Sequence, residues 1–327
     1  MRYVSGIFAI AAGITVAGMP TVSHAQSDQM SLVVGSLGGT MGRLGSGIVD
    51  VFNNNEAGSK LSVTPGGGRA NPARVGEGGG DFGFSFTNFV STAIAGQAPY
   101  DKAYPNLRAV ARFYDACYHQ YVAKDLYDSG IKSWEDIVKS SSPLKVGISK
   151  KGTSTEFVGS VLVDALGSSY KQLEDRGYKL TFAGTSANSR AIRSKQVDIY
   201  FHNSGDPNGA GVEAALGRDL RFLDMSPKVK SILASNGFTP CVIPGGLYKG
   251  VDNNTDSMGL AGMVFTTEDM SADAVYAMLK QTNENLDTLG NVHKVFKSWN
   301  PEYASQVGSI PMHEGAMRFF KEKGVMK

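Results

Sequence analysis

The stretch Leu32-Val33-Val34-Gly35-Ser36-Leu37-Gly38-Gly39-Thr40 joins an apolar strand to a loop of glycine and hydroxyl residues. Residues 44–52 then place apolar side chains at helical spacing, so the loop opens a helix. Glycine has no Cβ, and the first N–H groups of a helix have no partner within the helix. Gly38, Gly39 and Thr40 therefore predict a loop where an anion can approach main-chain N–H groups.

Residues 1–25 have the features of an export signal. Arg2 is the only charge, residues 6–17 form a short apolar stretch, and Ser23-His24-Ala25 supplies small residues before a cut. The apolar stretch is shorter than the roughly 20 residues of a spanning helix, although an uncleaved anchor is the alternative. We expect cleavage after Ala25 and a periplasmic protein. Because an exported protein meets few nucleotides, the loop is expected to bind a small carboxylate rather than a nucleotide phosphate.

Length favours a two-lobe protein, and the charge balance gives no sign of a nucleic-acid partner. A mature chain of about 300 residues exceeds the usual size of one hydrophobic core. The 32 Lys and Arg residues nearly balance the 30 Asp and Glu residues, giving a formal net charge of +2. Clustered basic residues are missing from the sequence, so we expect no nucleic-acid partner.

Strand-like and helix-like segments alternate along the chain. Strands are expected at residues 32–35, 61–64, 81–86, 145–148, 180–183 and 197–201. Helices are expected at residues 44–52, 71 onward, 87–95, 157–166, 186–195, 271–289 and 311–323. This alternation predicts an α/β sheet covered by helices, in which ligands bind beyond the carboxyl ends of the strands.

Motifs of metal sites and of common enzymes are absent from the sequence. The five histidines, at positions 24, 119, 202, 293 and 313, never fall at a two-ligand helical spacing, and neither H-E-x-x-H nor C-x-x-C occurs. G-x-S-x-G and G-K-[ST] are also missing. We therefore expect no metal and no cofactor, and the missing motifs argue against the commonest hydrolases and nucleotide-using enzymes. Because no nucleophile and base can be paired in the sequence, we expect that the protein is not an enzyme. The two cysteines, Cys117 and Cys241, form one disulfide or remain two buried thiols.

Four segments of the chain, in this order, resemble TAXI-type solute-binding proteins, the extracytoplasmic receptors of TRAP transporters. They are residues 35–40, Gly67-Gly68 with Asn71, Gly152-Thr153-Ser154-Thr155-Glu156, and residues 310–320. The last, which begins Ile-Pro-Met-His-Glu-Gly-Ala, is the most specific. The resemblance extends over nearly the whole mature chain.

The resemblance implies a type II periplasmic binding protein fold, with two α/β lobes, a hinge and a ligand cleft between them. The first lobe is expected at residues 27–121 plus 244–327, and the second at 122–243. Cys117 and Cys241 fall near the two crossing points on this map, so the resemblance favours a disulfide at the hinge. It also implies a monomer that delivers its ligand to TRAP permease subunits.

The same resemblance implies a mechanism in which closure of the lobes surrounds a small organic anion, namely a carboxylate, a ketoacid or an acidic amino acid. Two helix N-termini meet the anion and hydroxyl groups add specificity. Arg69 is the preferred cation. The residues expected at the ligand are Gly38, Gly39, Thr40, Met41, Gly67, Gly68, Arg69, Asn71, Ser85, Thr87, Gly152, Thr153, Ser154, Thr155, His202 and Asn203.

Some features leave other interpretations open. Asn71, Thr87 and Ser186 could simply cap helices. Met41-Gly42-Arg43 stands where the family has tyrosines and a proline, and Gly68 replaces a serine, so the ligand of a family member does not transfer directly. The alternatives for function are a binding protein of an ABC or tripartite tricarboxylate importer, and a periplasmic enzyme on the same scaffold.

Overall fold

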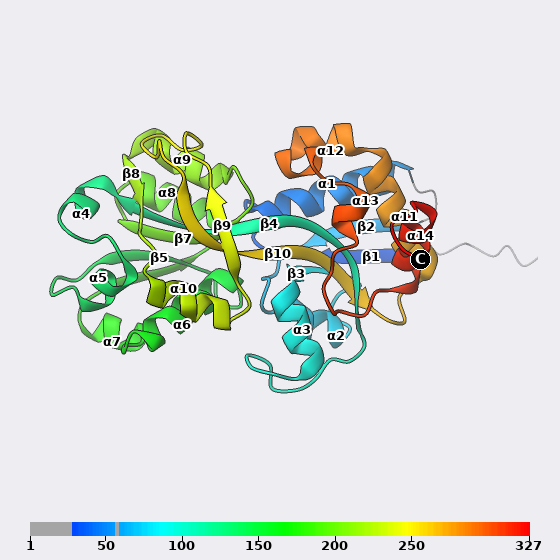
Figure 1. Ribbon diagram of the computed structural model, residues 1–327, viewed down its shortest axis with the longest axis horizontal. Coiled ribbons are helices and arrows are strands. Elements are labelled where there is room, and N and C mark those ends of the chain that lie inside the picture. Colours follow the sequence, from blue (N-terminus) through cyan, green and yellow to red (C-terminus); the bar gives the residue numbers. More distant parts are fainter. Residues whose placement is uncertain (1–27, 56–58) are drawn as a thin grey trace, which may run out of the picture.

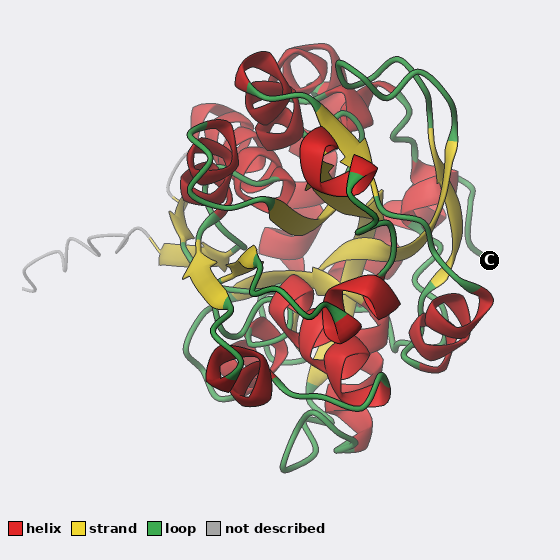
Figure 2. Cartoon of the chain, turned by 90° about the vertical axis from the view of Figure 1, so that its left-hand side faces the viewer, coloured by secondary structure: helices red, strands yellow, loops and turns green. Residues whose placement is uncertain are grey.

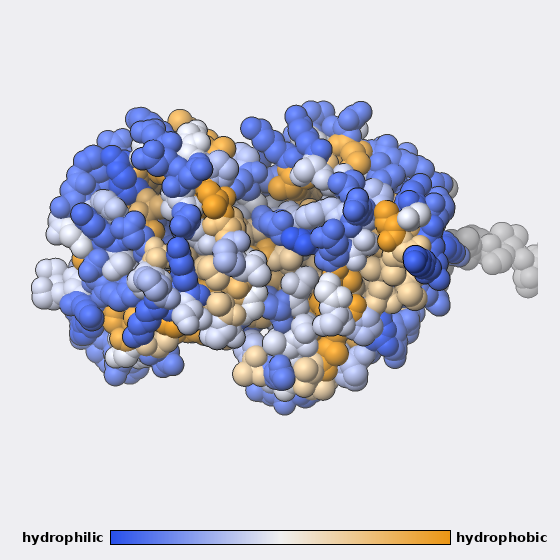
Figure 3. Space-filling view, viewed as in Figure 1, coloured by the Kyte–Doolittle hydropathy of each residue, from blue (hydrophilic) through white to orange (hydrophobic). Residues whose placement is uncertain are grey.

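The computed structural model describes residues 28–55 and 59–327, so the expected export signal at residues 1–25 lies outside the described part. Two lobes lie side by side and are joined at a narrower waist (Figure 1). In the view turned by 90°, helices lie at the top and bottom of the molecule and strands run between them (Figure 2). On the face shown in Figure 3, hydrophilic residues cover the outer ends of both lobes and apolar residues form scattered groups.

The first lobe begins with alternating strands and helices. These are β1 (Asp28–Val33), α1 (Thr40–Asn55), β2 (Ser59–Thr64), α2 (Asn71–Gly76), β3 (Phe82–Phe86) and α3 (Thr87–Ala95). Parallel pairing gives the strand order β2-β1-β3. The C-terminal helices complete this lobe: α11 (Ala272–Glu284), α12 (Leu286–Val292), the 3-10 helix η1 (Lys294–Lys297), α13 (Pro301–Ala304) and α14 (Glu314–Glu322).

The second lobe repeats this arrangement. Its core elements are β5 (Lys145–Ser149), α6 (Ser154–Ala165), α7 (Tyr170–Asp175), β6 (Lys179–Ala183), α8 (Thr185–Arg193) and β7 (Ile199–Ser204). Parallel pairing gives the order β6-β5-β7, which matches β2-β1-β3. The remaining elements are α4 (Lys124–Asp128), α5 (Trp134–Lys139), α9 (Gly209–Gly217), β8 (Leu220–Phe222), α10 (Pro227–Ser235) and β9 (Thr239–Ile243).

Two long antiparallel strands, β4 (Leu107–Ala123) and β10 (Thr255–Thr267), run across the waist (Figure 1). One end of β10 pairs with β3 and the other with β9. β4 pairs with β10 up to Cys117 and then with β7. The sheets of the two lobes are therefore continuous through these strands.

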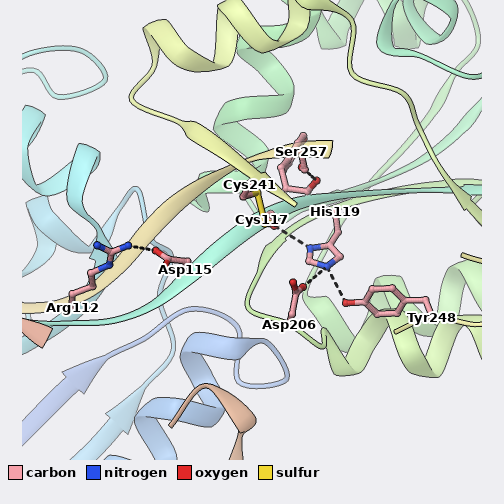
Figure 4. The surroundings of a disulfide bond; sticks show 9 residues. Arg112, Asp115, Cys117, His119, Asp206, Cys241, Tyr248 and Ser257 are labelled. Carbon is pink, nitrogen blue, oxygen red and sulfur yellow. Dashed lines mark hydrogen bonds and ion pairs between the residues drawn. A yellow bond between two sulfur atoms is a disulfide. The ribbon is translucent and has the colours of Figure 1, made fainter. Parts of the chain in front are cut away.

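A disulfide joins Cys117 on β4 to Cys241 on β9 at the waist (Figure 4). The two Cα atoms are 6.1 Å apart. Next to it, the buried His119 places Nδ1 3.0 Å from the carbonyl oxygen of Cys117 and Nε2 2.9 Å from the hydroxyl of Tyr248. Asp206 lies 3.0 Å from the same Nε2. The waist is thus held by a covalent bond and a polar cluster beside it.

The predicted strands and helices match the observed ones closely, with one clear exception. The amphipathic pattern from residue 271 predicts one long helix, but the structure has two, α11 and α12. Asn285 separates them with a non-helical backbone, and its side-chain amide donates to the carbonyl oxygen of Gln281 at 2.8 Å. An asparagine side chain that competes with the backbone in this way favours helix ends.

The capping interpretations of Asn71, Thr87 and Ser186 are wrong. Each of these residues lies inside its helix, and the cap positions are Ala70, Phe86 and Gly184, which make no side-chain cap. Instead, Asn71 is fully buried and holds neighbouring loops together. The helix starts of α2, α3 and α8 therefore have no side chain of their own to bind their first N–H groups.

Candidate functional site

A buried cavity lies between the lobes, where the strands of both lobes end and helices begin. Its volume is about 40 Å³. Since one water needs about 10–15 Å³ by this measure, roughly three waters or a small molecule can fit. The cavity is lined by Gly35, Ser36, Gly39, Thr40, Met41, Gly68, Phe86, Tyr114, Ser149, Thr153, Ser154, Thr155, Thr185, His202 and Asn203.

The lining divides into two chemically different walls. The first-lobe wall consists of Gly35, Ser36, Gly39, Thr40, Met41, Gly68 and Phe86, with Tyr114 from β4. The second-lobe wall consists of Ser149, Thr153, Ser154, Thr155, Thr185, His202 and Asn203. Glycine and apolar groups dominate the first wall, whereas every side chain of the second is polar. Among the described residues, those that line the cavity include no lysine, arginine, aspartate or glutamate.

Three helices begin at the cavity: α1 from the first-lobe wall, and α6 and α8 from the second. Within the described residues, two leading N–H groups of each helix have no acceptor; they belong to Thr40, Met41, Ser154, Thr155, Thr185 and Ser186. Each helix start carries a partial positive charge worth about 0.3–1 kcal/mol toward an anion. The cavity therefore attracts negative charge without a cationic side chain.

Side chains of the second-lobe wall fix α6 to the end of β7. The Thr155 hydroxyl accepts from the backbone N–H of Asn203 at 3.1 Å, and the Ser154 hydroxyl accepts from its side-chain amide at 3.1 Å. Thr153 caps α6 by accepting from the N–H of Glu156 at 3.2 Å. These three hydroxyl oxygens act as acceptors within the protein. They therefore orient the free N–H groups at the start of α6, in addition to any contact with a ligand.

Other polar atoms at the cavity have no partner. Both ring nitrogens of His202, the Oδ1 atom of Asn203 and the hydroxyl of Ser149 are buried without a hydrogen bond among the described residues. Burial lowers the pKa of His202 to about 3, and the nearby His119 contributes to this lowering. Burial disfavours the imidazolium, so the His202 ring is neutral at physiological pH. A ligand or water molecule that supplies the missing hydrogen bonds to such buried atoms is stabilised by them.

Direct contacts between the lobes close the cavity. The N–H of Ala70 donates to the carbonyl oxygen of Gly152 at 3.0 Å. A Cβ on Gly67 would lie 2.5 Å from that same oxygen, and a Cβ on Gly38 would lie 2.0 Å from the hydroxyl of Ser186. Glycine at positions 38 and 67 therefore allows the two backbones to approach this closely.

Nine of the sixteen residues predicted for the site line the cavity, and the others lie around it. The lining members are Gly39, Thr40, Met41, Gly68, Thr153, Ser154, Thr155, His202 and Asn203. Outside it, Gly38, Gly67 and Gly152 form the close approach between lobes. Ser85 donates to the carbonyl oxygen of Gly68, Asn71 supports the loops, and Thr87 lies in the first turn of α3.

Arg69, the predicted cation, does not line the cavity. Its guanidinium lies 3.9 Å from the carboxylate of Glu156 on α6 and 6.0 Å from the ring centroid of Phe157. The side chain is 30% exposed. The position of Arg69 favours a contact between the lobes over a contact with the ligand, because its guanidinium is already paired with the carboxylate of Glu156.

Six lining residues were not predicted: Gly35, Ser36, Phe86, Tyr114, Ser149 and Thr185. Thr185 follows a glycine directly after a predicted strand, which is the pattern that identified Gly39-Thr40. Ser149 directly follows the strand predicted at residues 145–148. Tyr114 lies in the middle of β4, and only the long-range pairing of β4 with β10 brings it to the cavity.

The described residues contain no group of three or more His, Cys, Asp or Glu that could hold a metal ion. The same part of the chain contains no helix that is both long and apolar enough to span a bilayer.

The chain belongs to the NMT1-like family, which matches residues 32–324. The fold is similar to that of a periplasmic binding protein, BugD, at 14% identity and a TM-score of 0.51, covering 90% of this chain and 94% of that one. It is also similar to MatC of Rhodopseudomonas palustris, solved with bound malate, at 14% identity and a TM-score of 0.50, covering 85% and 90%. The predicted two-lobe α/β fold of type II periplasmic binding proteins is confirmed.

Proposed function

We propose that this protein is an extracytoplasmic solute-binding receptor of a TRAP transporter, and that closure of its two lobes captures a small organic anion. The observation that carries the proposal is the meeting of three helix starts, from both lobes, at one buried cavity with unpaired polar atoms. An anion there completes hydrogen bonds on both walls at once. Its binding therefore favours the closed arrangement, which is the form a permease recognises.

The remaining parts of the proposal rest on the sequence. Residues 1–25 are an export signal, so the receptor is periplasmic. The family resemblance favours a monomer. Its lobes are residues 27–121 plus 244–327, and 122–243. The TAXI resemblance supports TRAP permease subunits as the partner. A neighbouring coding sequence for a fused large and small permease subunit would distinguish this from an ABC or tripartite tricarboxylate importer.

A thermal-shift panel of monocarboxylates, dicarboxylates, ketoacids and amino acids tests the ligand class. Malate, seen in MatC, belongs in this panel. We expect at least one acid to raise the melting temperature, and native mass spectrometry of freshly purified protein to find it bound. A rise produced only by neutral sugars or cations would overturn the proposal. Recovery of the acid unchanged after incubation distinguishes a receptor from an enzyme on the same scaffold.

A further inference from the structure

The second-lobe wall contains hydrogen-bond acceptors as well as donors, and His202 is the clearest case. It lies on β7 with its ring stacked on Tyr200, 5.9 Å between centroids and 17° between planes. Its Nε2 atom is 3.6 Å from the Cβ position of Gly39, which lines the cavity. Neither ring nitrogen has a partner. The imidazole therefore presents unused hydrogen-bonding capacity at the cavity.

A neutral imidazole has one N–H donor and one lone-pair acceptor in either tautomer. One ring nitrogen of His202 can therefore donate to an acceptor, and the other can accept from a donor. A carboxylate supplies acceptors only. A second requirement comes from Asn203, which is 5% exposed. Its amide nitrogen donates to Ser154, so its Oδ1 atom remains an unpaired acceptor at the same wall.

We propose, on the basis of the anion-binding role above, that the ligand carries a hydrogen-bond donor next to its carboxylate, so that it is a hydroxy acid or an amino acid. The carboxylate lies at the starts of α1, α6 and α8, and the hydroxyl or ammonium group donates toward His202 and Asn203. A ketoacid or an unsubstituted acid of the same length leaves buried acceptors unpaired. Sites built to bind a ligand hydroxyl or amine reject analogues without that group strongly.

Calorimetry with matched acids on the intact mature protein tests this inference. The sets are lactate, alanine, pyruvate and propionate, and then malate, aspartate, oxaloacetate and succinate. In the set that fits the cavity, we expect the hydroxy or amino acid to bind roughly tenfold tighter or more than the donor-free acids. Equal binding of pyruvate and lactate, or of succinate and malate, would overturn the inference and leave the anion-binding role intact. Binding of no acid in either set would overturn the anion-binding role, and this inference with it.

Substitution of His202 locates the discrimination. His202→Phe keeps a ring to stack on Tyr200 but removes both nitrogens. We expect the preference for the donor-bearing acid to fall to within about threefold, while the donor-free acid retains its affinity. His293→Phe is the matched control, because His293 lies outside the cavity lining. An unchanged preference in a folded His202→Phe protein would overturn the assignment of the donor to His202. If His202→Phe does not fold, the inference is tested by the ratio of affinities for donor-bearing and donor-free acids, measured on the unmodified protein.

Discussion

The two lobes share one scaffold but present different chemistry to the cavity. Both have the same strand order, β2-β1-β3 and β6-β5-β7, and both have helices that begin at the cavity. The first-lobe wall is largely glycine and apolar, whereas the second-lobe wall is entirely polar. In the proposed receptor, this difference assigns recognition of the ligand mainly to the second lobe, while the first lobe covers the ligand and adds the helix start of α1.

A buried asparagine supports the loops in each lobe, and the two make different numbers of contacts. Asn71 accepts from the N–H of Gly67 at 2.9 Å and places its amide nitrogen 2.7–3.1 Å from three carbonyl oxygens of β1, β3 and the residue after β1. Asn188 donates to the carbonyl oxygens of Ile148 and Ala183 at 3.0 and 2.9 Å, and its Oδ1 atom is unpaired.

Replacement of these asparagines is expected to cause the largest loss of stability, measured as the free energy of unfolding. Asn71→Ala should lower the free energy of unfolding by about 3 kcal/mol and Asn188→Ala by about 2 kcal/mol, because buried backbone groups lose their partners. Urea unfolding of both variants measures this. A larger loss for Asn188→Ala would show that the second lobe depends more on its asparagine than the first does.

Gly67→Ala should weaken ligand binding without unfolding the protein. The added Cβ meets the carbonyl oxygen of Gly152, a backbone atom of the other lobe, so the lobes cannot close fully. We expect about 2 kcal/mol, or roughly 30-fold, lower affinity for the acid with the largest thermal shift. Gly290→Ala is the control, since its Cβ approaches only the flexible side chain of Lys297 at 3.2 Å. Equal affinities of the two variants in calorimetry would contradict this account of closure.

Lowering the pH should destabilise the protein partly through protonation of His202 in the second-lobe wall. The pKa of His202 is about 3 in the folded protein and about 6.5 in an unfolded chain, so the unfolded chain binds the proton first as pH falls. Stability from this group is therefore present above about pH 6.5 and decreases toward pH 3. His202→Phe should make the slope of stability between about pH 6.5 and pH 5 shallower. An identical slope in both proteins would show that His202 is not buried as a neutral ring.

The smallest effect is expected for Arg69→Ala. A solvent-accessible contact with Glu156 at 3.9 Å contributes little, so affinity for the best acid should change by about 1 kcal/mol or less. Calorimetry measures this directly. A loss of about 2 kcal/mol or more would instead identify Arg69 as the ligand's cation and move part of the recognition to the first lobe.

Local sequence patterns predicted most of the fold. The strand-loop-helix units around Gly39-Thr40 and Thr153–Thr155 were identified because their signals lie within a few residues of one another. The break at Asn285 was missed, since apolar spacing continues through it and does not reveal the hydrogen bond from the Asn285 side chain to Gln281 at the end of the helix.

The cavity was only partly predictable, for a physical reason. Residues at helix starts could be identified because the topology places them at the carboxyl edge of the sheet. Tyr114 could not, since its position depends on the pairing of β4 with β10. The side chain of Arg69 points toward Glu156 in the other lobe. No local sequence pattern encodes this contact between lobes.

The hydrogen bond between Ala70 and Gly152 joins main-chain atoms of the two lobes. A contact of this kind does not depend on which side chains surround it. In the proposed receptor, backbone atoms therefore hold part of the closed arrangement, whereas the preference for a solute depends on the side chains of the cavity.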